Sequence, residues 1–87
     1  MEAIGILESN SIAKGIEAAD AILKAADTSL LFSKPVCPGK YTTLFYGDVA
    51  AVEEAVKCGM AAGTEKGLAL SSVVIPSPRE EIFAALL

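Results

Sequence analysis

One stretch near the middle of the chain restricts the backbone more than any other: Lys34-Pro35-Val36-Cys37-Pro38-Gly39-Lys40. Each of its prolines fixes φ at about −65°, and its glycine permits a conformation closed to other residues. The flanking segments, residues 29–34 and 40–46, are rich in apolar, aromatic and threonine residues, which is typical of strands. We therefore expect a stiff, sharply bent loop that joins two antiparallel strands and carries the Cys37 sulfur at or near its tip.

Before this hairpin, the sequence predicts a strand and then a helix. Residues 3–8 form a short apolar segment typical of a buried strand. Ser9, Asn10 and Ser11 then offer three candidate helix caps. The apolar residues that follow recur at the spacing of one helical face, which predicts a helix over residues 12–26 with this apolar face: Ile12, Ile16, Ala19, Ile22, Leu23 and Ala26.

After the hairpin, the pattern of helix and strand repeats. Asp48 is a good cap for a second helix, which ends by Gly67 and whose apolar face is Val49, Val52, Val56 and Met60. Residues 68–75 predict a fourth strand. Ser77 is followed by a proline and, three residues later, by a glutamate, which is the pattern of a capping box. A short terminal helix over residues 78–86 is the expected consequence.

The predicted elements follow one another as β-α-β-β-α-β, with a short helix at the end. This order is typical of a ferredoxin-like α+β fold, in which a four-stranded antiparallel sheet carries two helices on one face. With 87 residues, the chain is long enough for one domain, which we place at residues 1–87.

The balance of apolar and charged residues indicates an oligomer. Apolar residues make up 53% of the chain and charged residues 21%, which is more apolar surface than one small core needs. We expect partner copies to cover the surplus. The net charge is −4 and no basic run occurs, so nucleic acid is not an expected partner. No apolar run is long enough to span a bilayer, and the N-terminus is acidic, so we expect neither a membrane nor export.

The reactive side chains are few. The chain has two cysteines, Cys37 and Cys58, and no histidine, which excludes a disulfide scaffold and every Ser-His or Cys-His arrangement. Cys58 lies in the second predicted helix, where we expect a small buried apolar residue. Cys37 alone cannot hold an iron–sulfur cluster, since clusters need three or four thiolates, but several copies at a symmetry axis could.

Four segments, in this order and spacing, carry a resemblance to a known family: Ala3-Ile4-Gly5-Ile6-Leu7-Glu8, Ile16-Glu17-Ala18-Ala19-Asp20-Ala21 with Lys24-Ala25-Ala26, Gly47-Asp48-Val49-Ala50-Ala51-Val52, and Ile75-Pro76-Ser77-Pro78. Over its whole length, the chain resembles the shell proteins of bacterial microcompartments. The resemblance implies the same ferredoxin-like fold. It also implies hexagonal tiles that pack with other shell proteins into a shell within the bacterial cytoplasm, and it implies no enzymatic activity.

The resemblance also gives the hairpin loop a role. In the family this loop lines a pore on the sixfold axis, and here it is Val36, Cys37, Pro38, Gly39 and Lys40. The Cys-Pro-Gly-Lys segment is similar to the subset whose loop cysteines bind an iron–sulfur cluster, as in propanediol-type compartments. This likeness implies that Cys37 is a metal ligand and that a 4Fe–4S cluster, shared between subunits, passes electrons across the shell.

The chain departs from that subset in two ways. The relative with this loop carries two such domains and forms a trimer, a pseudo-hexamer with three thiols, whereas a hexamer of this chain would bring six. The family's tile edges often carry an arginine where this chain has Ser77, and Arg79 follows two residues later. Lys24 resembles the lysine that lies along its symmetry mate at the tile edge. Lys24 and Arg79 are therefore the candidate tile-edge contacts.

Other functions remain open at this point. The first alternative is a tile whose pore gates small metabolites and holds no metal. An acylphosphatase-like hydrolase on the same fold would need an arginine in a phosphate-binding loop, whereas Arg79, the chain's one arginine, lies near the C-terminus. A nucleotide-sensing trimer would need a glycine-rich phosphate loop, which the sequence lacks.

Overall fold

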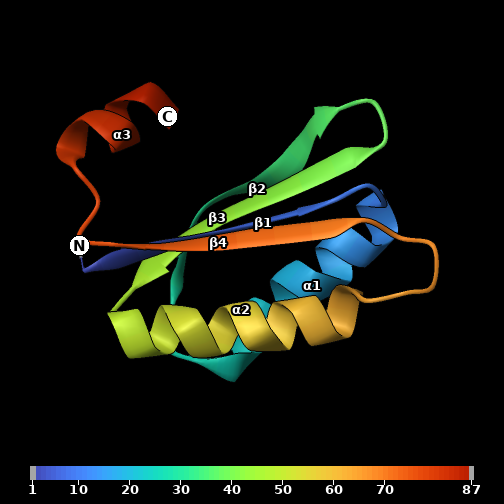
Figure 1. Ribbon diagram of the computed structural model, residues 1–87, viewed down its shortest axis with the longest axis horizontal. Coiled ribbons are helices and arrows are strands. Elements are labelled where there is room, and N and C mark those ends of the chain that lie inside the picture. The colour runs from blue at the N-terminus through green and yellow to red at the C-terminus, as the bar shows by residue number, and fades with distance from the viewer. Residues whose placement is uncertain (1, 87) are drawn as a thin grey trace.

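The computed structural model describes residues 2–86 (Figure 1). The elements follow the predicted order: β1 Ala3–Ser9, α1 Ile12–Ala25, β2 Ser29–Cys37, β3 Lys40–Gly47, α2 Val49–Gly63, β4 Leu70–Pro76 and α3 Glu80–Leu86. The strands form one sheet in the order β2-β3-β1-β4, and each neighbouring pair is antiparallel. The predicted α+β class is confirmed.

The two long helices and the short one lie on opposite sides of the sheet. Figure 1 shows α1 and α2 packed against one face, while α3 lies beyond the other face, at the end of the sheet where the chain begins. We call the face without α1 and α2 the open face. The core lies between the sheet and the two long helices, where Leu7, Ile22, Phe45 and Val52 are each 1% exposed or less.

Both long helices begin where polar side chains cap them. The Ser11 hydroxyl accepts a hydrogen bond from the Lys14 N–H at 3.2 Å, and the Asp48 carboxylate accepts one from the Ala51 N–H at 2.8 Å. Each cap satisfies one of the backbone donors that a helix start leaves free. Of the three candidate caps before the first helix, Ser11 is therefore the one used.

The predicted apolar face of α1 is buried only in part. The buried residues are Gly15, Ala18, Ala19 and Ile22. By contrast Ile12, Ile16 and Leu23 are 42%, 52% and 43% exposed. A Cβ at Gly15 would lie 2.6 Å from the Tyr41 Cβ, so the helix approaches the sheet closely at Gly15, and Ile22 is the one large residue of the predicted face that is buried. The spacing of the apolar residues predicts the helix, but it does not predict which side of the helix faces the sheet.

The last two predicted elements begin later than expected. β4 begins at Leu70 rather than Leu68, because the Leu68 N–H donates to the Glu65 carbonyl in a turn. The predicted capping box is also wrong. Ser77 has a φ of 48°, whereas a capping residue has an extended backbone, and its N–H donates to the Glu2 carbonyl at 2.6 Å. The chain turns at Ser77, and α3 starts at Glu80.

A methyl group at Gly5 should destabilise the fold strongly. A Cβ there would lie 2.6 Å from Phe45 Cε2 and 2.9 Å from Val52 Cγ1, in the centre of the core. We expect Gly5→Ala to lower the free energy of unfolding by about 3 kcal/mol, measured by urea denaturation, because a close-packed core cannot yield this space. The control is Gly63→Ala, whose Cβ would lie 3.2 Å from its nearest neighbour. Its loss should stay within about 1 kcal/mol, and equal losses would contradict the argument.

Candidate functional site at the β2–β3 turn

The loop between β2 and β3 is shorter than predicted. β2 continues to Cys37 instead of ending at Lys34, and Cys37 pairs with Lys40 across the hairpin. Only Pro38 and Gly39 remain as the turn. Gly39 has a φ of 78°, and a proline followed by a glycine of positive φ is typical of a type II turn. The expected sharp bend is confirmed, and the thiol lies directly at the start of the turn.

The base of the hairpin is anchored while its tip is exposed. Tyr41 is 9% exposed against α1, and its hydroxyl accepts a hydrogen bond from Ser33 at 2.9 Å. Pro35 pairs with Tyr41, and the register shifts between Pro35 and Cys37. An edge strand such as β2 tolerates both a proline and a bulge. From Val36 to Lys40 every residue is exposed, and the Cys37 thiol is free.

The two lysines beside the thiol are held differently. The Lys34 ammonium lies 4.9 Å from the centre of the Phe32 ring, on its own strand. The Lys40 ammonium lies 3.9 Å from a carboxylate oxygen of Glu8, which belongs to β1. Each lysine thus has a contact within the chain.

A single chain does not assemble a metal site at the turn. Within residues 2–86, no group of three or more histidine, cysteine, aspartate or glutamate side chains is placed to hold a metal ion. One exposed thiol per chain fits an iron–sulfur cluster only where the turns of several copies meet, since three or four thiolates are needed. The residues present fit the cluster on that condition.

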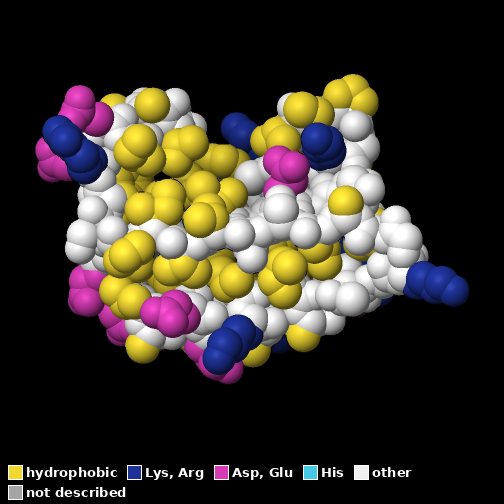
Figure 2. Space-filling model, viewed as in Figure 1, with side chains coloured by type: hydrophobic (Ala, Val, Ile, Leu, Met, Phe, Trp, Pro, Cys, Tyr) yellow, Lys and Arg dark blue, Asp and Glu magenta, His cyan; other side chains and the backbone are white. Residues whose placement is uncertain are grey.

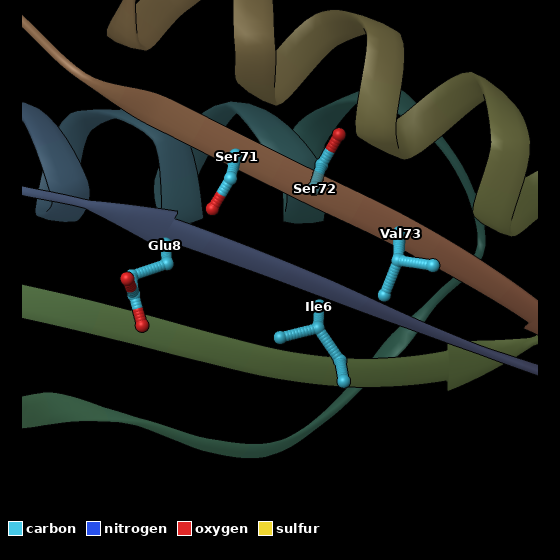
Figure 3. Close-up of a pocket in the computed structure, with 5 residues that line it drawn as sticks. All are labelled: Ile6, Glu8, Ser71, Ser72 and Val73. Atoms are coloured by element: carbon cyan, nitrogen blue, oxygen red, sulfur yellow. The ribbon is translucent and has the colours of Figure 1, made fainter.

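A shallow hollow on the open face was missed by the sequence analysis. It has a volume of about 310 Å³ and is lined by Ile6, Glu8, Ser71, Ser72 and Val73 (Figure 3). Figure 2 shows apolar side chains gathered beside α3 and charged side chains closer to the hairpin. Antiparallel pairing of β1 with β4 brings these residues together, so no local sequence signal could have found them.

Comparison with known proteins decides the family. A model of the BMC domain matches residues 3–78. The chain belongs to the BMC-domain family. It is 44% identical over 85 residues to the bacterial microcompartment shell protein PduT of Citrobacter freundii, covering 98% of this chain and 45% of PduT. It is 41% identical over 86 residues to the shell protein EutM of Salmonella typhimurium, covering 95% of this chain and 90% of EutM.

A solved structure agrees with the BMC fold. A microcompartment protein from Desulfitobacterium hafniense superposes with a TM-score of 0.87 and is 48% identical, covering 99% of this chain and 47% of that one. The chain therefore spans about half the length of PduT and of the Desulfitobacterium protein, and most of EutM. These matches confirm the predicted family. The likeness of the turn to the iron–sulfur-binding subset stays a prediction.

In this BMC domain the candidate edge residues lie far from the turn. Gly47, at the end of β3 opposite the turn, approaches the Asp27 carbonyl that follows α1, and it pairs with Ala3. Lys24 is in the last turn of α1, and Arg79 follows Pro76, which also pairs with Ala3. The chain thus places the thiol at one end of the sheet and both candidate edge residues toward the other.

Both candidate edge residues form exposed ion pairs within the chain. The Lys24 ammonium lies 2.7 Å from an Asp20 oxygen, and the Arg79 guanidinium lies 2.8 Å from a Glu81 oxygen. The hydrogen bond to Asp20, followed by the charge of that carboxylate, raises the pKa of Lys24. Exposed pairs such as these contribute little stability and can exchange partners, so both cations remain available to a neighbouring copy.

An apolar strip runs along one side of α1. Ile12, Ile16 and Leu23 lie on one flank of the helix, and we call them the α1 flank. Ala18 marks the opposite flank, since a Cβ at Gly63 of α2 would lie 3.2 Å from the Ala18 Cβ. The α1 flank therefore points away from α2. Large apolar side chains in such an array are typical of a surface that another protein covers.

The second cysteine, Cys58, lies on α2. It is half-buried, whereas the sequence predicted a buried residue, and its sulfur lies 3.7 Å from a Glu54 oxygen on the same helix.

Within residues 2–86, no helix is long and apolar enough to cross a membrane.

A side chain at Gly39 should strain the turn. Its φ of 78° is unfavourable for residues with a Cβ, although no atom lies within 4 Å of the position a Cβ would take. We expect Gly39→Val to lower the free energy of unfolding by about 1–2 kcal/mol through the backbone alone. Chemical denaturation measures this loss. Gly67→Val is the matched control, with a φ of 83° and equally open surroundings, and its loss should be similar.

Proposed function

We propose that this chain is a structural shell protein of a bacterial microcompartment. Identical copies form a ring, a hexamer for single chains or a trimeric pseudo-hexamer where the domain is part of a tandem chain, and the rings pack with other shell proteins in the bacterial cytoplasm. The names of PduT and EutM and the match to the BMC domain support the shell role. The exposed α1 flank supports assembly, since a second copy that covers it removes three large apolar side chains from water.

In the ring, the β2–β3 turn of each copy lies at the axis and lines an aperture. The separation within one chain supports this arrangement, because the exposed turn and the two candidate edge cations, Lys24 and Arg79, lie toward opposite ends of the sheet. A chain with this arrangement can place the turn at the centre of the ring and both cations at its outer edge.

The aperture carries an iron–sulfur cluster held by Cys37 from several copies. The observation that carries this proposal is one free, exposed thiol at the start of the turn. When bound, such a cluster accepts and releases one electron at a time, which suits electron transfer across the shell. The turn itself, Pro38 and Gly39, fixes the direction of the strand end that bears the thiol.

The second candidate is an aperture without metal that gates small metabolites. The count of thiols favours it, because a hexamer brings six copies of Cys37 to an axis where a cluster takes three or four. The exposed Lys40 would then set the charge of the opening.

Anaerobic reconstitution separates the two candidates. The purified protein is incubated with iron and sulfide, desalted, and assayed for visible absorbance, iron and acid-labile sulfide, while native mass spectrometry gives the number of chains. The first proposal expects a brown ring with about four iron atoms. A colourless ring with no bound iron supports the metal-free aperture, and a folded single chain contradicts both.

A further inference from the structure

We propose that Glu8 positions the ammonium group of Lys40 and so determines the charge at the Cys37 turn. Lys40 is the charged residue of the turn segment, and its ammonium lies 3.9 Å from the Glu8 carboxylate. The proposal rests on the proposed function for its meaning in the shell. Its chemistry, however, requires neither a ring nor a bound cluster.

The strand register explains why these two side chains meet. Glu8 of β1 pairs with Thr42 of β3. Lys40 stands two residues before Thr42 and therefore shares its face of the sheet. Glu8 and Lys40 are thus diagonal neighbours, a separation that long side chains bridge. Figure 3 shows the Glu8 side chain directed to the open face, away from the helices.

A polar row crosses all four strands at this level. Thr42 pairs with Lys34 on one side and with Glu8 on the other, and Glu8 pairs with Ser71. The next row toward α3 is apolar: Phe32, Leu44, Ile6 and Val73. Lys34 does not turn to Glu8, because its ammonium lies over the Phe32 ring. Lys40 is therefore the lysine that contacts the Glu8 carboxylate.

The sheet order gives this contact a direction. β3 lies between β2, which carries Cys37, and β1, which carries Glu8. An ammonium that leans from β3 toward Glu8 moves away from the thiol on β2. Glu8 thus has two effects on the turn. It holds the Lys40 ammonium away from Cys37, and its negative charge compensates the charge of that ammonium.

The consequence for the aperture concerns selectivity. Lys40 without Glu8 would add one uncompensated positive charge per copy around a narrow opening, which attracts anions and repels cations. Lys40 paired with Glu8 adds little net charge to the opening. We therefore assign Glu8 as a specificity-determining residue for the charge of whatever binds or passes at Cys37, although it lies outside the turn.

The rate at which charged reagents modify Cys37 measures the local potential. A Cys58→Ala background leaves one thiol. The anionic reagent 5,5′-dithiobis(2-nitrobenzoate) and the neutral reagent 4,4′-dithiodipyridine both react with the same thiolate, and each releases an absorbing aromatic thiol product. The ratio of the two rates cancels the thiolate fraction and the accessibility of the sulfur, so it reports the charge around the sulfur.

A double-mutant cycle then separates positioning from simple charge. At low salt we expect Glu8→Gln to raise the anionic-to-neutral ratio about threefold and Lys40→Gln to lower it about twofold. In the Lys40→Gln background, Glu8→Gln should change the ratio less than 1.5-fold, about half its effect or less, because no ammonium is left to release. Glu53→Gln, which removes an exposed carboxylate on α2, is the matched control and should leave the ratio unchanged.

Equal effects of Glu8→Gln in both backgrounds would overturn the proposal, since the two charges would then act independently. An unchanged ratio in Glu8→Gln would overturn it as well. Neither result touches the reconstitution experiment, in which Glu8 takes no part as a ligand. A failure here is therefore distinguishable from a failure of the proposed cluster.

Discussion

Cys37→Ser should leave the protein colourless after anaerobic reconstitution, with at least tenfold less bound iron and sulfide than the unsubstituted chain. A serine hydroxyl is a hard, protonated ligand at neutral pH, whereas iron–sulfur clusters are held by thiolates. The loss is complete rather than partial because each copy supplies one thiol at the turn, and the substitution removes it from every copy in the ring.

The fold should be unaffected by this substitution. Cys37 is exposed at the start of the turn, where a change of sulfur to oxygen leaves the packing intact, so we expect a change in unfolding free energy within about 0.5 kcal/mol. The matched control is Cys58→Ser on α2, which should bind as much iron as the unsubstituted chain. Colour that survives Cys37→Ser, or that disappears in Cys58→Ser, would show that the turn is not the metal site.

The order of elements could be predicted because each leaves a local signal. Helix caps such as Ser11 and Asp48, the apolar runs of the strands, and the proline-glycine pair all act over a few residues. The turn illustrates both the success and its limit. Its sharp bend follows from the residue types, but the extension of β2 to Cys37 depends on pairing with β3, which the sequence of β2 alone does not contain.

The rotation of α1 could not be predicted from periodicity. Apolar spacing identifies a stripe on a helix, but it does not say whether the stripe faces its own sheet or a partner. Here the close approach of Gly15 to Tyr41 turns the side with Ala18 and Ile22 toward the core and leaves Ile16 outside. The start of α3 was missed for a related reason, because the backbone bond from Ser77 to Glu2 joins distant parts of the chain.

The Glu8–Lys40 contact was likewise beyond a local analysis. The two residues are far apart in sequence and meet only through the register of β1 against β3. Glu8 and Lys40 are charged residues of a common type, and neither stands out in the sequence of its strand. Residues that act through pairing carry no spacing signature, whereas the thiol of Cys37 is conspicuous because its residue type is rare in this chain.

Ile16→Glu should convert the assembly into folded single chains. Ile16 is 52% exposed in one chain and lies in the middle of the α1 flank, so the substitution costs the isolated fold little, and glutamate favours a helix more than isoleucine does. In the proposed ring, the next copy covers the same position. A carboxylate buried there without a partner weakens each interface by about 3 kcal/mol, or roughly a hundredfold in affinity.

Light scattering coupled to size-exclusion chromatography measures this effect, and circular dichroism verifies the fold. Ala13→Glu is the matched control, since it adds the same charge to an exposed position of α1 outside the flank, and it should retain the ring. A ring that persists in Ile16→Glu would place the interface elsewhere. The result matters for the metal proposal too, because a turn that supplies one thiol per chain gains further ligands only through contacts between copies such as this one. Iron binding in Ile16→Glu should therefore fall together with the assembly, although Cys37 itself is unchanged.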